Sequence, residues 1–191
     1  MSQPDSMSLA HVVLTSLLEK PSSGYELARR FDKSMGFFWH ATHQQIYREL
    51  KRMEDQGWIS SNPALDAGKT KKKTYQVLDA GKQELEHWVK LHIDPYQVRE
   101  ELAVRLRAEA MLNTGHLAQE LQRHLKLHED KLALYLAIEQ RDFIRNPITD
   151  QPLSREQQIQ HRVLLLGIET QKTWIEWAKE TIALFKKLDQ T

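Results

Sequence analysis

Apolar and polar residues alternate at helical spacing over the first third of the chain. A stripe of leucine and valine at i, i+3 and i+4 predicts a first helix from about Ser8, its N-cap, to Glu19. Ser23 and Glu26 have the spacing of a capping box, in which each side chain accepts a hydrogen bond from a backbone N–H group at the helix start. A second helix is therefore expected to open at Ser23.

A third helix is expected to begin at Thr42, which has the spacing of a second capping box with Gln45. One face of this helix is apolar, because Ile46 is followed by further apolar residues four and seven positions later. Gly57 comes directly after the last turn, where a residue in the left-handed conformation commonly ends a helix.

The pattern then changes to two short strands. Residues 58–61 and 74–78 have the β-branched and aromatic content of strands, and a polar loop separates them. Asp79 is expected to cap a fourth helix that runs to about Val89. Three helices, a hairpin and a further helix have the order of a winged helix-turn-helix, although other small α+β domains share that order.

From residue 93 onward the pattern is purely helical, with helices expected over 96–112, 116–145 and 154–188. Ser154 is the expected cap of the last helix. Apolar residues form a seam along each of the two longer helices. These seams include Leu121, Leu125, Leu132, Ile159, Val163, Leu166, Trp174, Trp177 and Leu184.

These seams have too little chain around them to be buried within one molecule. A partner subunit is the simplest way to bury them, and helix-turn-helix proteins pair in order to contact two half-sites. The alternative is an intramolecular helical hairpin packed on the first domain. The predicted fold is mainly α with a small β-hairpin: an amino-terminal winged helix-turn-helix over 1–92 and a helical, coiled-coil-like dimerisation domain over 93–191.

The net charge of the chain is only +1, so the sum says little about partners. The distribution says more, because four lysines with no acid among them lie between Asp66 and Asp79: Lys69, Lys71, Lys72 and Lys73. Such a cluster is either a phosphate-binding patch or a solvated loop. Its place on the expected hairpin, directly after the third helix, favours phosphate binding.

The third helix also has a polar outward face. At 100° per residue from Ile46, Tyr47 lies at about 100°, Lys51 at about 140°, Gln44 at about 160° and Arg48 at about 200°. Glutamine pairs with adenine and arginine with guanine in the major groove, whereas tyrosine and lysine suit phosphates. The candidate DNA-binding residues are therefore Thr42, His43, Gln44, Tyr47, Arg48 and Lys51, together with the four lysines. Plain solvent exposure is the alternative.

Two other features have competing interpretations. The aromatic run Phe37-Phe38-Trp39 is either a stacking platform or core packing that fixes the start of the third helix, and burial tendencies favour core packing. His124 and His128 have a spacing that can hold zinc, but two ligands do not make a site.

No enzyme class is indicated. The chain has no cysteine, which excludes disulfides, thiolate metal sites and cysteine nucleophiles. Glycine motifs of hydrolases, nucleotide-binding loops and dinucleotide-binding folds are absent. We therefore expect a binding protein without cofactor or metal. The apolar runs are too short to span a bilayer and no signal peptide is visible, so we expect no membrane partner and a cytoplasmic location.

Four stretches are distinctive as strings of residues: Ser23-Gly24-Tyr25-Glu26-Leu27, Gly36-Phe37-Phe38-Trp39, His43-Gln44-Gln45-Ile46-Tyr47-Arg48-Glu49-Leu50 and Met53-Glu54-Asp55-Gln56-Gly57-Trp58-Ile59. They resemble the PadR family of bacterial transcriptional regulators. The helical half, with Trp174-Ile175-Glu176-Trp177-Ala178, is similar to the virulence-activator-like branch of that family.

The resemblance implies a winged-helix protein that binds promoter DNA as a homodimer. It also implies that Tyr47, its polar neighbours and the lysine hairpin contact the DNA. A protein–protein adaptor that does not bind DNA is the alternative. Some members of the family respond to phenolic acids or planar drugs and others to no small ligand. The resemblance therefore assigns no effector to this chain, and neither repression nor activation.

Overall fold

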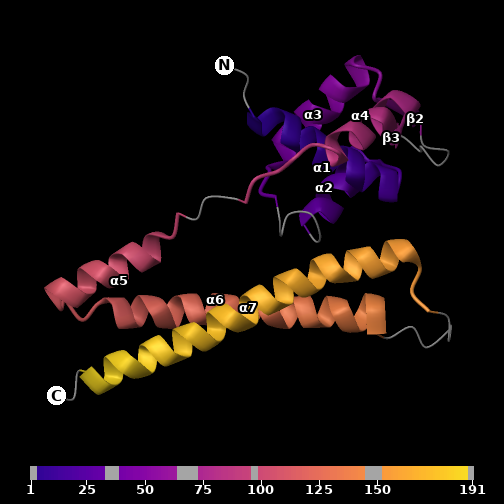
Figure 1. The fold of residues 1–191 in the computed structure, drawn as a ribbon. Coiled ribbons are helices and arrows are strands. Elements are labelled where there is room, and N and C mark those ends of the chain that lie inside the picture. Colours follow the sequence, from indigo (N-terminus) through magenta and orange to yellow (C-terminus); the bar gives the residue numbers. More distant parts are fainter. Residues whose placement is uncertain (1–3, 33–38, 64–72, 96–98, 145–151, 189–191) are drawn as a thin grey trace. The chain divides into compact units, whose positions relative to one another are not determined.

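The computed structural model describes residues 4–32, 39–63, 73–95, 99–144 and 152–188, and contacts divide the chain into two units, Met1–Tyr96 and Gln97–Thr191 (Figure 1). The amino-terminal unit contains α1 (Pro4–Glu19), β1 (Ser22–Ser23), α2 (Gly24–Asp32), α3 (His43–Asp55), β2 (Ile59–Pro63), β3 (Lys73–Val77) and α4 (Asp79–Val89). The carboxyl-terminal unit contains α5 (Glu101–Leu112), α6 (Leu117–Glu139), the π-helical turn η2 (Gln140–Ile144) and α7 (Arg155–Leu188). The fold is mainly α with a small antiparallel sheet, as predicted.

The core of the amino-terminal unit lies where α1, α2 and α3 meet. Its largest side chains with almost no access to solvent are Leu14, Leu17, Leu27, Phe31, Ile46, Leu50 and Met53. Each comes from the apolar stripe of its helix, so the helical periodicity of the sequence matches the observed burial.

The first helix begins earlier than expected. We predicted Ser8 as its N-cap, but α1 begins at Pro4. Proline suits the first turn of a helix, because its fixed φ is helical and its missing N–H group would have no partner there. The predicted N-cap is therefore wrong, because Ser8 lies within α1.

Both predicted capping boxes are confirmed. At the start of α2 the Ser23 N–H group and hydroxyl donate to Glu26 Oε2 at 3.1 and 2.8 Å, and the Glu26 N–H group donates to Ser23 Oγ at 3.3 Å. At the start of α3 the Thr42 N–H group donates to Gln45 Oε1 at 2.8 Å, and Thr42 Oγ1 accepts from Gln45 N–H at 3.2 Å. Gly57, with φ of +70°, follows the end of α3 as expected.

The sheet has one strand more than predicted. Its order is β1-β3-β2, with both pairs antiparallel, and the register of the expected hairpin runs from Ile59 opposite Val77 to Pro63 opposite Lys73. The added strand β1 pairs Ser22 with Tyr75. Two serines have no periodicity of their own, so nothing in the sequence pattern marked them as a strand. Through β1, the hairpin is joined directly to the start of α2.

The start of α4 differs in detail from the prediction. Its N-cap is Leu78, which makes no side-chain cap bond, and Asp79 is instead the first helical residue. There the carboxylate suits the positive end of the helix dipole and pairs with Lys82 at 3.0 Å.

In the carboxyl-terminal unit, α6 and α7 pack along each other as a hairpin (Figure 1). Ser154 caps α7 by exchanging bonds with Gln157 at 2.9 and 3.2 Å, as expected of a cap. The helix α5 begins at Glu101, later than the predicted residue 96, and ends at Leu112; its C-cap is Asn113, whose φ of +48° is left-handed.

The helix α7 buries a different stripe from the one we predicted as its seam. The buried residues alternate in steps of four and three, as in a coiled coil: Leu164, Ile168, Gln171, Ile175, Ala178 and Ile182. The predicted seam lies about 130° further round the helix, at 100° per residue. Most of it is exposed, including Ile159, Val163, Leu166, Trp177 and Leu184.

The predicted seam of α6 is used within the chain. Leu121 has no exposed surface and packs with Leu102, Leu117 and Ile182, so it is not available to a partner subunit, contrary to our expectation. Leu125 and Trp174 are half-buried against the same cluster, and Leu132 is half-buried on α6. The helices α6 and α7 thus form a hairpin within the chain, and a second apolar stripe of α7, the predicted seam, remains mostly exposed.

Trp39 packs against the core of the amino-terminal unit, whereas Phe37 and Phe38 lie outside the described residues. Trp39→Ala should lower the free energy of unfolding by about 2 kcal/mol, less than the roughly 3–5 kcal/mol of a fully buried aromatic. Urea denaturation would measure this. Leu18→Ala is the control, because Leu18 is 52% exposed. Equal and small losses in both variants would show that Trp39 is not part of the core.

The burial of His128 of α6 should make the stability of the carboxyl-terminal unit depend on pH. Its ring stacks on Trp174 at 3.7 Å between centroids, and its Nδ1 lies 2.6 Å from Gln171 Oε1. Burial lowers the pKa of His128 below its ordinary 6.5. The unfolded chain then binds the proton more readily, so stability contributed by neutral His128 is present above the unfolded pKa and is lost as pH falls below it.

The effect of His128 can be isolated by substitution. His128→Gln should reduce the difference in unfolding free energy between about pH 8 and about pH 5, whereas His116→Gln, at an exposed position, should leave it unchanged. Denaturation of each variant at both pH values gives the comparison. An unaltered difference in His128→Gln would contradict the assignment.

Candidate nucleic-acid interface

The outward face of α3 is set by its buried face. Ile46, Leu50 and Met53 are within 1% of full burial. Glu49, beside them on the same side of the helix, is 6% exposed and pairs with Arg52. With that face fixed, the opposite side of the helix is in solvent. Gln44, Tyr47, Arg48 and Lys51 are all exposed there.

The two candidates at the start of α3 have partners within the chain. Thr42 is exposed, and its hydroxyl is engaged in the capping box. His43 is exposed and its Nε2 lies 2.8 Å from Asp32 Oδ2, at the end of α2. This contact joins the two helices of the helix-turn-helix across their connection.

Of the four hairpin lysines, only Lys73 falls within the described residues. It is the first residue of β3, it is exposed, and it pairs in register with Pro63. Lys69, Lys71 and Lys72 lie outside the described residues. The hairpin follows α3 directly in the chain, so α3 and Lys73 belong to one supersecondary unit.

The side chains behind this face are held by hydrogen bonds and burial. Ser61 Oγ donates to Glu54 Oε1 at 2.5 Å, which joins β2 to α3. Burial is the main cause that raises the pKa of Tyr75, with smaller contributions from nearby Glu54 and Tyr47.

One exposed pair on α2 was missed in the sequence. Arg29 lies over the ring of Tyr25, 5.8 Å from its centroid, and both side chains are exposed. The i, i+4 spacing of an aromatic and a cation was the available signal. In helix-turn-helix proteins the first helix crosses the DNA backbone, which is where such a cation is useful.

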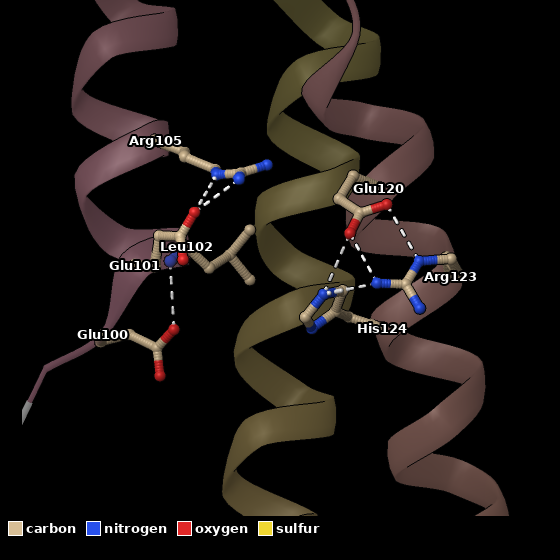
Figure 2. A network of polar contacts seen from close by, with 7 residues as sticks. All are labelled: Glu100, Glu101, Leu102, Arg105, Glu120, Arg123 and His124. Atoms are coloured by element: carbon tan, nitrogen blue, oxygen red, sulfur yellow. Dashed lines mark hydrogen bonds and ion pairs between the residues drawn. The ribbon is translucent and has the colours of Figure 1, made fainter.

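The carboxyl-terminal unit has a cavity whose charged lining residues pair with neighbouring side chains. A cavity of about 220 Å³ is lined by residues of α5 and α6 with the residue that caps α5: Glu100, Glu101, Leu102, Arg105, Glu120 and His124. Figure 2 shows that Arg105 bonds Glu101 and that Arg123 and His124 bond Glu120. The Arg123 hydrogen bond is the main cause that lowers the pKa of Glu120 to about 2.

The arginines of this network pair with carboxylates of their own helices. Arg105 pairs with Glu101 on α5 and Arg123 pairs with Glu120 on α6, which stabilises the helix surface. Across the described ranges no group of three histidine, aspartate or glutamate side chains is arranged to hold a metal ion. No helix in those ranges is long and apolar enough to cross a membrane.

The helical cluster, the outward polar face of α3 and the sheet that follows it define a winged helix-turn-helix protein, a class that binds nucleic acid. Residues 13–87 match the "Transcriptional regulator PadR-like family", and residues 98–186 match "Virulence activator alpha C-term". The chain is 35% identical to the "Probable transcriptional regulator Rv1176c" of Mycobacterium tuberculosis, over 91% of this chain and 95% of the relative.

Solved structures support the same family assignment. Bacillus subtilis PadR in complex with operator DNA superposes with a TM-score of 0.79 at 27% identity, over 93% of this chain and 97% of PadR. The Vibrio cholerae virulence activator AphA gives a TM-score of 0.74 at 27% identity, over 94% and 99% of the two chains. The chain belongs to the PadR-like family and is a DNA-binding transcriptional regulator.

Gln44 and Lys73 should differ in how they affect DNA binding. Gln44→Ala should lose about 1–3 kcal/mol on the preferred sequence and little on random duplex, because an amide at the helix start suits adenine. Lys73→Ala should weaken both duplexes alike and reduce the slope of log affinity against log salt by about one unit. Titration of each variant against both duplexes at several salt concentrations would measure this. The opposite pattern in the two variants would reverse the assignment.

Proposed function

We propose that this regulator binds a roughly palindromic promoter sequence as a homodimer, with α3 in the major groove. The observation that carries the proposal is the exposure of Gln44, Tyr47 and Arg48 on a helix whose opposite face is fully buried. Such a helix presents side chains at fixed positions, which contact with base edges requires. The complex of Bacillus subtilis PadR with operator DNA supports double-stranded DNA as the partner.

Residues 1–92 form the DNA-binding domain in this proposal. Its phosphate contacts are made by Tyr47 and by the hairpin lysines Lys69, Lys71, Lys72 and Lys73. Lysine is a point charge without the planar geometry that selects one base, so these contacts position the domain. Thr42 and His43 contact DNA from the start of α3. The protein acts by binding rather than by catalysis, and it acts in the cytoplasm, where bacterial promoter DNA lies.

Residues 93–191 form the dimerisation domain. The uncovered stripe of α7 supports this, because five of its apolar residues are 38–69% exposed: Ile159, Val163, Leu166, Trp177 and Leu184. A contiguous apolar surface of this kind is typical of a protein–protein contact. Burial of the stripe against a second copy places two recognition helices on two half-sites.

Selection of bound fragments from genomic DNA, followed by sequencing, tests the function. Recovery of one recurring, roughly palindromic sequence supports the proposal. Recovery of no enriched sequence, with no shift of duplex DNA in a gel, would favour the alternative of a protein–protein adaptor. Titration of the recovered duplex would then give the affinity of the full chain.

Charge placed on the α7 stripe should separate the subunits. Leu166→Glu should shift sedimentation equilibrium from dimer to monomer, because a carboxylate in an apolar contact loses its hydration without gaining a partner. Affinity for the two-half-site duplex should fall with it. Ala183→Glu is the matched control, since Ala183 is exposed about 100° round α7 from Leu166. A Leu166→Glu protein that remains dimeric with native affinity would refute this interface.

A further inference from the structure

Gly24, the first residue of α2, is buried under the ring of Tyr47. A β-carbon at Gly24 would lie 2.6 Å from Tyr47 Cε1 and 3.2 Å from Tyr47 Cδ1, whereas it would meet Leu50 Cδ1 at an ordinary 3.5 Å. Its φ does not lie in the left-handed region, which among the described glycines holds only Gly57 and Gly115. Glycine is therefore required at position 24 for the space that it leaves and not for its backbone conformation.

The backbone beneath the Tyr47 ring is fixed from two sides. Ser23, the residue before Gly24, is the N-cap of α2 and bonds Glu26, while strand β1 pairs Ser23 with Thr74 of β3. The start of α2 therefore cannot shift without breaking both the capping box and the strand pair. Tyr47, by contrast, is 46% exposed and its ring is free to rotate toward solvent.

We propose that Gly24 is a positioning residue for DNA binding. Because Gly24 has no side chain, the Tyr47 ring packs directly against the start of α2, and this contact holds the phenol hydroxyl at one place on the outward face of α3. The inference rests on the proposed function, in which Tyr47 contacts a phosphate. A methyl group at position 24 displaces the ring outward, and because the ring can move into solvent, the core beneath it stays intact.

The test is a double-mutant cycle in the full-length protein, with the duplex recovered by selection as the probe. Tyr47→Ala and Gly24→Ala should each weaken binding about tenfold, the effect of one lost hydrogen bond to a charged group. Gly24→Ala should cause no further loss in the Tyr47→Ala background, because no ring remains to be displaced. Arg48→Ala is the matched control, because Arg48 is exposed beside Tyr47 but has no atom among those nearest Gly24. The fold-losses of affinity from Arg48→Ala and Gly24→Ala should therefore multiply in the double variant.

Thermal unfolding of the same variants separates positioning from folding. Gly24→Ala should unfold close to the native midpoint, and any decrease should disappear when Tyr47→Ala is added. A decrease that persists in the double variant would overturn the proposal, as would equal losses of affinity from Gly24→Ala with and without Tyr47. If Tyr47→Ala itself kept native affinity, the phosphate contact of the proposed function would also be refuted, so the two failures are distinguishable.

Discussion

Ile46, Leu50 and Met53 have almost no access to solvent, and their burial against α1 and α2 decides which side of α3 faces outward. Rotating the helix to expose them would cost about 1.5–3 kcal/mol for each apolar side chain. The outward set of side chains is therefore fixed by the core and not by their own interactions. A helix that reads DNA needs this property, since one rotated by even a few tens of degrees would present other side chains to the bases.

The same logic explains why α7 has two apolar stripes. One stripe, from Leu164 to Ile182, is used within the chain to pack α7 on α6 and α5. The other, from Ile159 to Leu184, is about 130° away, and most of its apolar side chains are exposed in the part of the chain that the structure describes. A helix with only the first stripe would make a stable monomeric hairpin. The second stripe gives the hairpin a surface that a second copy can cover while leaving the internal contact intact.

Much of the fold was predictable because it rests on local signals. The boxes Ser23–Glu26 and Thr42–Gln45, the glycine after α3 and the helical periodicities each involve residues within a few positions of one another. What escaped the sequence is set by contacts between distant residues. Strand β1 exists because Ser22 meets Tyr75, and Leu121 is internal because α5 and α7 cover it.

The candidate site likewise has a part that the sequence predicts and a part that depends on contacts between distant residues. Periodicity alone placed Gln44, Tyr47, Arg48 and Lys51 on the outward side, and all four are exposed. The contact of Tyr47 with Gly24 joins residues of different helices, so no spacing rule reveals it. Likewise, an i, i+3, i+4 pattern on α7 shows that apolar stripes exist but does not say which of them packs within the chain.

A net charge of +1 makes the geometry of the basic groups more important than their number. A protein with little excess charge gains little general attraction to a polyanion, so its non-specific affinity depends on the few cations that reach phosphates directly. Base contacts from one α3 add only a few kcal/mol. In the proposed homodimer, pairing two such helices through α7 makes binding at the second half-site intramolecular, and the resulting effective concentration raises affinity without any further charge. On this proposal the α7 stripe and the outward face of α3 act together: modest contacts, made twice at fixed spacing, take the place of a strongly basic surface.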